Sequence, residues 1–462
     1  MQHATHTALP LPPGPRGYPI VGVLPRLWPN PLDLLLELRH TYGDVVHLGA
    51  HWFLLAHPDH LALVLNENAA AYHKGGPVKQ LHPILGMGLP LNDGPAWRRQ
   101  RRLVQPAFNR QQIQSYIPMI AQNTLTMLED WRYRDQPVDI EDAMMQLTLH
   151  IIVTMLFGSG LATDDIRAIG AAFTTVHELA SYRSRTLIAP PLALPTSQHR
   201  QFREAIQFLN GIVQQSIATY RHNPDETTSM LSVLLHTRDA ETGETMSDQQ
   251  LRDEVMTLLM AGHETTANAL TWVWYLLAQH PTIEAQLAAE AMQVLQGHAP
   301  EVADLPRLSY TRQVIEETLR LYPPGWTVMR TPLRDEVIGG YRIPARSTLL
   351  LSPYITHRHP AFWEQPEYFD PARFAPNRAA TRPRYAYLPF GGGPRVCIGN
   401  HLALMEAQII VACIAQACQL QLESTEPVPI QPLFTLRPAR PILMHVQWRA
   451  EKTRAVGDFG KN

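Results

Sequence analysis

Apolar residues recur every three or four positions along most of this chain, which is the spacing of helices with one buried face. The pattern predicts helices over Leu32–Leu38, Ile117–Asp130, Ile140–Leu156, Asp165–Arg185, His199–Tyr220, Thr282–Gln296 and Leu308–Leu321. Strand-like stretches are short and have glycine-containing turns between them; they are Val45–Leu48, Trp52–Ala56, Tyr341–Ile343 and Thr348–Leu351. We therefore expect a mainly α-helical protein with small β-sheets.

The longest helical pattern runs from Ser247 to about His280. Ser247 and Gln250 have the spacing of a capping box, and the segment that follows is apolar nearly all round, as in a helix buried within a large protein. Its centre nevertheless reads AGHETT, from Ala261 to Thr266. Burying so many polar groups is costly unless they are paired or used, so we expect a functional site on this helix.

Two other interpretations of that centre exist. His263-Glu264 matches the first half of the zinc motif His-Glu-x-x-His, but position 267 is Ala, so the second zinc ligand is missing. A helix kink with satisfied polar groups is the purely structural alternative.

A second unusual stretch is FGGGPRVCIG, from Phe390 to Gly399. Three consecutive glycines suit neither helix nor strand, but permit positive φ angles and close approach of the backbone. The start of the helix expected after this loop, together with Arg395, would stabilise a Cys397 thiolate. No base for nucleophilic chemistry is recognisable, and ligation of a haem iron explains more of the loop. On the loop alone, a glycine turn before a buried core cysteine stays open.

The pattern Phe390-x-x-Gly393-x-Arg395-x-Cys397-x-Gly399 resembles the proximal loop of the cytochrome P450 family, the haem-thiolate monooxygenases. The resemblance covers the chain from about residue 12 to 448, with the family's motifs in its order. It implies the cytochrome P450 fold, with haem b (iron protoporphyrin IX) between the long central helix and the cysteine loop. Cys397 would be the iron ligand.

The resemblance also implies which residues hold the haem. Trp97 and Arg101 share a helix face and match a Trp-x-x-x-Arg pattern that binds haem propionates in the family. Arg330 and Arg395 would reach the propionates as well, with Lys74 as a further candidate. The full set of expected cofactor-binding residues is Lys74, Trp97, Arg101, Ala261, Arg330, Phe390, Gly393, Arg395, Cys397 and Gly399.

On the central helix, the resemblance implies that Thr265 hydrogen-bonds dioxygen and that Glu264 brings protons from solvent. Gly262 would loosen the helix, so that a threonine hydroxyl takes over a backbone acceptor. An apolar substrate pocket is expected from Trp326, Val328, Met329 and Phe434. The helices over 165–185 and 199–220 would form its roof.

Glu317 and Arg320 are three residues apart in an apolar helix and resemble the family's Glu-x-x-Arg element. Arg373, in the segment Pro371–Phe374, is the expected partner. One buried carboxylate held by two guanidinium groups would lock the core on the cysteine side of the haem, so we expect a structural triad.

The implied reaction inserts one oxygen atom from O2 into a C–H or C=C bond of an apolar molecule such as a fatty acid or a terpenoid. No electron-transfer domain is recognisable, so electrons would come from a ferredoxin or flavodoxin-type donor with its reductase. Arg98, Arg99 and Arg102 would help an acidic donor to dock. The nearest alternatives are a peroxide-driven peroxygenase and a haem-based sensor, and neither would need the pair Glu264-Thr265.

Composition narrows the expected partners and location. The 462 residues carry 39 Lys and Arg against 41 Asp and Glu, a net charge of −2 that predicts neither a nucleic-acid nor a membrane partner. Three cysteines make no disulfide framework, and we place Cys413 and Cys418 in a helical core. No signal peptide or membrane anchor is recognisable at the N-terminus, so we expect a cytoplasmic monomer of the soluble bacterial type. The predicted organisation is a proline-rich arm (1–30), a catalytic domain (31–449) and a polar tail (450–462).

Overall fold

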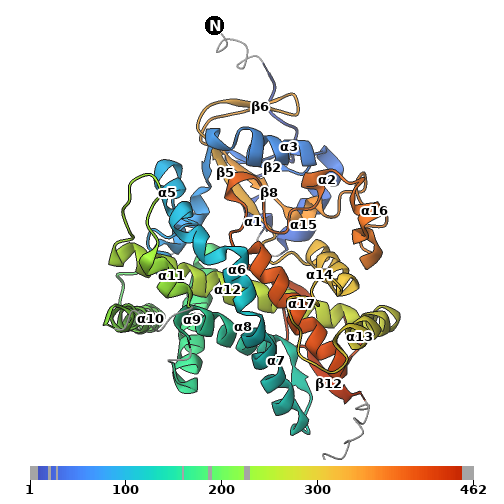
Figure 1. The fold of residues 1–462 in the computed structure, drawn as a ribbon. Helices are drawn as coiled ribbons and strands as arrows, with labels where there is room; N and C mark the ends of the chain where they lie inside the picture. Colours follow the sequence, from blue (N-terminus) through green and yellow to red (C-terminus); the bar gives the residue numbers. More distant parts are fainter. Residues whose placement is uncertain are drawn as a thin grey trace, which may run out of the picture.

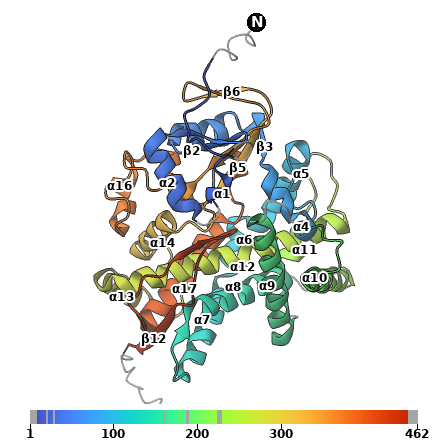
Figure 2. The ribbon, with the colours of Figure 1, turned by 180° about the vertical axis from the view of Figure 1, so that it is seen from behind.

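The long central helix organises the fold. The computed structural model describes residues 9–18, 22–27, 30–158, 161–185, 190–222 and 229–449. Figures 1 and 2 show α12 crossing the middle of a mostly helical body, with α8 and α17 beside it and the strands β2, β5 and β8 gathered toward one end. The predicted polar tail and parts of the predicted arm lie outside the described residues.

The helices agree closely with the apolar pattern. They are α1 Leu24–Leu27, α2 Pro31–Tyr42, α3 Pro58–Ala62, α4 His82–Leu85, α5 Gly94–Val104, α6 Arg110–Ser115, α7 Ile117–Arg132, α8 Ile140–Phe157, α9 Thr163–Arg185, α10 Ser197–His222, α11 Met230–His236, α12 Asp248–Gln279, α13 Pro281–Leu295, α14 Ser309–Leu321, α15 Pro353–Thr356, α16 Pro376–Ala379 and α17 Asn400–Ala417. Ser247 caps α12 as predicted, because its hydroxyl accepts a hydrogen bond from the Gln250 N–H at 3.2 Å.

α8 lies against α12 over much of its length, and a glycine permits the close approach. A Cβ atom at Gly262 would lie 2.8 Å from the side chain of Ile152 in α8. α8 is also the one helix, within the part of the chain that the structure describes, with the length and hydropathy of a membrane span. Since 61% of that stretch is buried inside the protein, it is a core helix here.

The strands form four small sheets. Their bounds are β1 Val45–Gly49, β2 Trp52–Leu55, β3 Tyr72–Lys74, β4 Val138–Asp139, β5 Val328–Pro332, β6 Glu336–Ile338, β7 Tyr341–Ile343, β8 Thr348–Leu351, β9 Cys418–Leu422, β10 Ile430–Pro432, β11 Leu436–Pro438 and β12 Leu443–Trp448. The largest sheet has the order β1-β2-β8-β5-β3. Its antiparallel β3 and β5 place Lys74 directly opposite Arg330, so two predicted haem ligands become neighbours.

One local prediction needs correction. Cys413 is buried in α17 as expected, but Cys418 begins β9 because α17 ends at Ala417. α3 is capped by His57, whose ring nitrogen accepts from the Asp59 N–H. The stretch from residue 74 to 91 contains a 3-10 turn over residues 76–81 and the short helix α4.

Candidate active site

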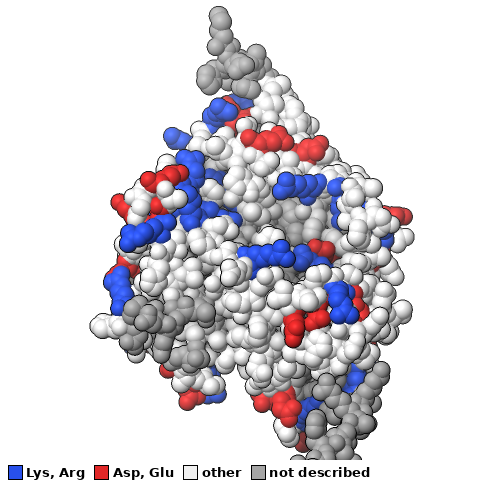
Figure 3. Space-filling view, viewed as in Figure 1, with Lys and Arg blue, Asp and Glu red and all other residues white. Residues whose placement is uncertain are grey.

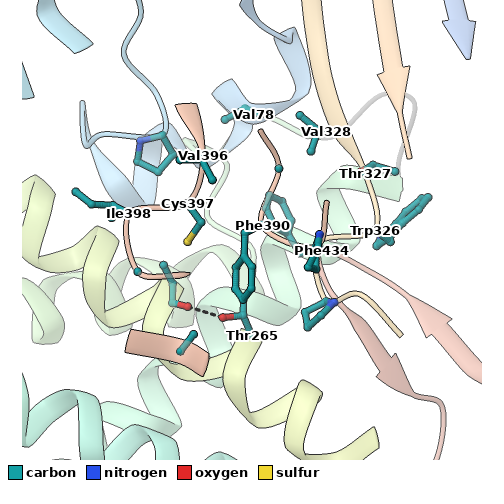
Figure 4. Close-up of a pocket in the computed structure, with 18 of the residues that line it drawn as sticks. Val78, Thr265, Trp326, Thr327, Val328, Phe390, Val396, Cys397, Ile398 and Phe434 are labelled. Carbon is teal, nitrogen blue, oxygen red and sulfur yellow. Dashed lines mark hydrogen bonds between the residues drawn. The ribbon is translucent and has the colours of Figure 1, made fainter. Parts of the chain in front are cut away.

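The cysteine loop and α12 enclose one large cavity of about 1100 Å³. Cys397 lines it from the loop that precedes α17, and Thr265 lines it from α12. Figure 4 shows the Cys397 sulfur pointing into this space, with Thr265 on the wall formed by α12. The structure therefore joins the two stretches that the sequence singled out, although more than 100 residues separate them.

The surroundings of Cys397 hold its sulfur at the cavity surface. Its N–H donates to the Phe390 carbonyl at 3.0 Å, which closes the loop. Burial raises the pKa of the thiol, whereas a hydrogen bond from the Gly399 backbone and the charge of Arg101 lower it. The sequence had suggested that Arg395 stabilises the sulfur. In the structure the cation that acts on the sulfur is Arg101, because Arg395 forms an ion pair with Asp93.

The glycines of this loop serve its shape. Gly391 and Gly393 adopt φ angles of +71° and +67°, the left-handed region that side chains other than glycine rarely occupy. A Cβ atom at Gly393 would also lie 1.7 Å from the Leu65 carbonyl oxygen. Phe390 and Gly399 line the cavity, as predicted for the cofactor site. Gly393 does not line it, so the structure gives this residue a conformational role.

Buried and half-buried cations gather at one edge of the cavity. Arg330 is 8% exposed, and within the described residues its one hydrogen bond from the guanidinium group goes to the Met329 carbonyl. Burial lowers the pKa of Arg330 to about 10 and, despite the charge of Asp93, that of Lys74 to about 7. Lys74 Nζ donates to the carbonyls of Leu89 and Asn92 at 2.6 and 2.8 Å. Such groups are stabilised by an anion placed between them.

Arg101, Arg395 and Trp97 complete this edge. Arg101 donates to the Val396 carbonyl at 2.9 Å, and Arg395 donates to the Tyr72 carbonyl at 2.8 Å and pairs with Asp93 at 2.9 Å. The Trp97 ring lies 5.6 Å from the Arg395 guanidinium and 5.8 Å from Lys74 Nζ. These contacts bring together all five residues that were predicted to hold propionates. Ala261, on α12, lines the cavity as well.

On α12 the two predicted catalytic residues point in different directions. Thr265 lines the cavity, and its hydroxyl donates to the Ala261 carbonyl at 2.8 Å, as predicted for this helix. Glu264 is 8% exposed and is not part of the cavity wall. Consecutive helical residues are separated by about 100° around the axis, which accounts for the difference.

Glu264 instead belongs to a buried polar network. Its Oε1 accepts from the Thr435 hydroxyl at 2.5 Å and from Arg437 at 3.0 Å, and its Oε2 lies 3.1 Å from His177 Nε2 on α9. Burial alone would raise the pKa of Glu264, but His177, Arg437 and Thr435 outweigh it, so the pKa lies below its ordinary value. The acid is thus ionised and fully bonded in this conformation.

The predicted triad forms beside α14. Arg320 holds both oxygens of Glu317 at 2.7 and 2.8 Å, and Arg373 Nε lies 3.3 Å from Glu317 Oε1. The side chains of Glu317 and Arg320 have no solvent exposure. Arg320 also donates to the backbone carbonyls of His357, Pro366 and Tyr368, so it joins α14 to the segment after α15.

The remainder of the cavity wall is largely apolar. Trp326, Val328, Met329 and Phe434 all line it, as predicted, and Figure 4 shows Trp326, Val328 and Phe434 around the same space. Several other residues of this wall belong to no recognised motif and were not predicted, among them Val78, Leu89, Phe108, Ile152, Glu254 and Leu258. Glu254 and Leu258 could have been found, since they have the helical spacing that places them on the face of Thr265.

Comparisons with known proteins identify the family. The sequence matches the family model for cytochrome P450 over residues 12–445. The chain belongs to the cytochrome P450 family. Cyclooctatin synthase and cyclooctat-9-en-7-ol 5-monooxygenase, both from Streptomyces melanosporofaciens, are 41% and 36% identical to it, with 90% of this chain covered in each case and 90% and 89% of those proteins. A crystal structure of the cytochrome P450DA heme domain superposes with a TM-score of 0.86 at 28% identity, covering 96% of this chain and 98% of that one.

As a cytochrome P450, the protein is a haem-dependent monooxygenase that acts on an apolar substrate with O2 and electrons from a redox partner. The residues present fit the cofactor. An edge with one buried and three half-buried cations and one paired carboxylate, Asp93, suits the two propionates of haem, and a thiol faces the same cavity.

The arginines that were expected to meet an electron donor are mostly engaged within the protein. Arg99 pairs with Glu244 at 3.1 Å, and Arg102 pairs with Asp239 and Glu241, both at 2.8 Å. Figure 3 shows this pattern as acidic side chains beside the basic ones over α5. A donor would therefore compete with these acidic partners for Arg99 and Arg102, while Arg98 is exposed.

Proposed function

We propose that this cytochrome P450 hydroxylates a terpenoid, with Cys397 as the thiolate ligand of the haem iron. The observation that carries the proposal is the shared cavity, which has a thiol on one wall, the Thr265 hydroxyl on another and buried cations at one edge. Haem ligated by a thiolate supplies the activation of dioxygen when it is bound. Residues of this chain would bind the haem, hold the proton and shape the substrate pocket.

Five residues would bind and orient the cofactor. Lys74, Arg101, Arg330 and Arg395 offer charge-assisted hydrogen bonds to carboxylates, and Trp97 packs beside two of these cations. Because Lys74 and Arg330 are buried, an anionic partner would restore the pKa values that burial lowers. Haem binding should therefore stabilise this edge of the protein.

Thr265 would hold a proton at the cavity wall, and Glu264 would resupply this proton from outside the cavity. The Thr265 hydroxyl is shared with the Ala261 carbonyl, which fixes its orientation on α12. Glu264 has to exchange at least one of its partners before it can carry a proton, and His177 is a natural candidate because it lies on α9, in the predicted roof.

The substrate would be an apolar molecule of terpenoid size. Trp326, Val328, Met329 and Phe434 give the wall aromatic and aliphatic surface, and the cavity of about 1100 Å³ has to hold both haem and substrate. The similarity to bacterial terpenoid monooxygenases favours a terpenoid over a fatty acid. We further propose a monomer in the cytoplasm that receives electrons from a ferredoxin or flavodoxin-type protein, docked over α5 through Arg98 and the exchangeable pairs of Arg99 and Arg102.

Replacing Thr265 with Ala tests the proposed proton role. The variant Thr265→Ala should bind haem and substrate as the wild type does, because within the described residues the one hydrogen bond of the Thr265 hydroxyl is that to the Ala261 carbonyl of its own helix. It should divert most reducing equivalents to hydrogen peroxide, measured as peroxide formed per NADPH consumed with a surrogate ferredoxin system. Unchanged coupling would remove Thr265 from the mechanism.

A further inference from the structure

A buried carboxylate with one unsatisfied oxygen lies in the cavity wall, well away from Glu264. Glu254 has no solvent exposure, and its Oε2 accepts a hydrogen bond from the Leu89 N–H at 3.1 Å. Its Oε1 has no hydrogen-bond partner within the described part of the chain. A buried oxygen in this state has lost its hydration without replacement, so a partner supplied by a bound molecule would be favourable.

The position of Glu254 on α12 relates it to the reacting end of the cavity. Glu254, Leu258, Ala261 and Thr265 have spacings of four, three and four residues, so they share one face of the helix, and all four line the cavity. Eleven residues correspond to about three turns, or roughly 16 Å along the axis. Glu254 therefore lies, with Lys74 nearby, at the end of the cavity remote from Thr265.

The neighbouring charges limit what Glu254 can bind. Burial and the adjacent Asp253 raise the pKa of Glu254 to about 7, against the Leu89 N–H and Lys74, which lower it. At neutral pH the group can thus accept a hydrogen bond or donate one. A cationic ligand would meet Lys74 nearby, and an apolar one would leave Oε1 unsatisfied. A hydroxyl group can both donate and accept, so it fits either protonation state.

We propose that Glu254 is a specificity residue which recognises a hydroxyl group already present on the substrate, so that the protein oxidises a terpenoid alcohol in preference to the parent hydrocarbon. The proposal rests on the function proposed above and narrows it. Its place in a reaction sequence follows, since an earlier step has to install that oxygen. One relative, cyclooctat-9-en-7-ol 5-monooxygenase, is itself named for an alcohol.

The chain offers a matched control next to Glu254. Asp253 holds the same loop through the Met87 N–H at 2.8 Å, but its other oxygen is occupied by Gln249 and Arg252, and it does not line the cavity. Asp253→Asn therefore perturbs the loop anchor, the pair with Arg252 and the charge beside Glu254, but it leaves the cavity wall unchanged. Glu254→Gln keeps an acceptor for Leu89, and Glu254→Leu removes all hydrogen bonding from the site.

The experiment titrates the haem-loaded full chain with geranylgeraniol and with its methyl ether, following the substrate-induced change of the haem absorption band. The wild type should bind the alcohol about tenfold more tightly than the ether, because a hydroxyl can donate to a carboxylate and an ether cannot. Glu254→Leu should abolish this preference and leave ether binding within about twofold. Glu254→Gln should reduce the preference, and Asp253→Asn should retain it.

Three results would overturn the proposal. The first is a preference for the alcohol that survives in Glu254→Leu. The second is wild-type protein that binds neither compound or binds both equally. The third is a Glu254→Gln variant whose haem absorption band is altered without ligand and which binds the alcohol and the ether equally more weakly than the wild type. Glu254 would then act on the haem edge or on the loop. Failure of the proposed function itself is distinguishable, because the reduced protein would then lack the carbon monoxide band of a thiolate-ligated haem.

Discussion

Two buried carboxylates, Glu317 and Glu264, each meet an arginine in this protein, yet they are held in different ways. Glu317 is gripped through both oxygens by Arg320 from the same helix, and neither side chain is exposed. Glu264 is held by Thr435, Arg437 and His177, which come from the region of β11 and from α9. Its side chain and that of His177 are each 11% exposed, and that of Arg437 is 24% exposed.

The difference shows which acid can exchange its partners. The remaining N–H groups of Arg320 donate to three backbone carbonyls, so separating Glu317 from Arg320 would leave buried charges without compensation. Glu264 can lose His177 and still keep Thr435 and Arg437. One cluster therefore suits a permanent structural role, and the other would suit a proton carrier that exchanges its partner on α9.

The largest effect is expected at Glu317. Glu317→Ala leaves Arg320 and Arg373 buried without their carboxylate, which should cost about 3–5 kcal/mol of unfolding free energy. Denaturant unfolding of the haem-loaded protein measures this loss. Glu316→Gln is the matched control, because Glu316 pairs with Arg312 in a half-buried position of the same helix and should cost below about 1 kcal/mol. Equal losses in both variants would contradict a special role for Glu317.

A smaller and different effect is expected at Glu264. Glu264→Gln should preserve the fold and the haem spectrum but lower the rate of product formation by about 100-fold, the lower range for loss of a general acid. Thr435→Val removes the 2.5 Å hydrogen bond to Glu264 but leaves the charge of Glu264. The rate of product formation should therefore fall less than in Glu264→Gln. Product formation under saturating donor measures both. If Glu264→Gln turned over at the wild-type rate, Glu264 would be structural like Glu317.

The sequence predicted the cluster of Glu317 but not the partners of Glu264. Glu317 and Arg320 lie three apart on one helix, so their contact follows from helix geometry alone. The partners of Glu264 could not be predicted in this way, because Thr435 and Arg437 meet α12 only through the folding of a distant hairpin. The same reason explains why the internal partners of Arg99 and Arg102 were not predicted: Asp239 and Glu244 belong to a separate polar segment.

The helices were predicted well because their apolar periodicity is local, and α12 differs from its prediction by one residue at each end. The cavity wall was predicted only in part. Motif residues such as Cys397, Trp97 and Arg330 carry a recognisable pattern, whereas the roles of Leu89 and Glu254 depend on which side of a helix or loop the fold buries. A buried oxygen without a hydrogen-bond partner, such as Glu254 Oε1, can be recognised only in the structure.

The smallest expected effect concerns pH and the region of Glu317. His357 is fully buried; its Nδ1–H donates to the Arg320 carbonyl at 3.1 Å, and its Nε2 accepts from the Leu388 N–H at 2.9 Å. Burial lowers the pKa of His357 to about 3. Because the unfolded chain takes up this proton near pH 6.5 and the folded protein does not, stability should fall as the pH drops below about 6.5.

Between pH 6 and 4, His357→Gln should reduce the slope of the unfolding free energy against pH by about 1.4 kcal/mol per pH unit. This slope corresponds to the uptake of one proton on unfolding. Urea unfolding of variant and wild type at several pH values measures the difference, and Glu264→Gln serves as a comparison outside this region. Parallel pH profiles for His357→Gln and wild type would show that the ring is protonated in the folded protein.

The central claim is that the Cys397 sulfur ligates the haem iron. The most direct measurement is the absorption spectrum of the reduced, carbon monoxide-bound protein, with Cys397→Ser beside the wild type and Cys413→Ser as a control for a buried core cysteine. The account predicts the red-shifted band of a thiolate-ligated haem in the wild type and in Cys413→Ser, and its loss in Cys397→Ser. A wild-type protein without the band, or a Cys397→Ser variant that keeps it, would contradict the account.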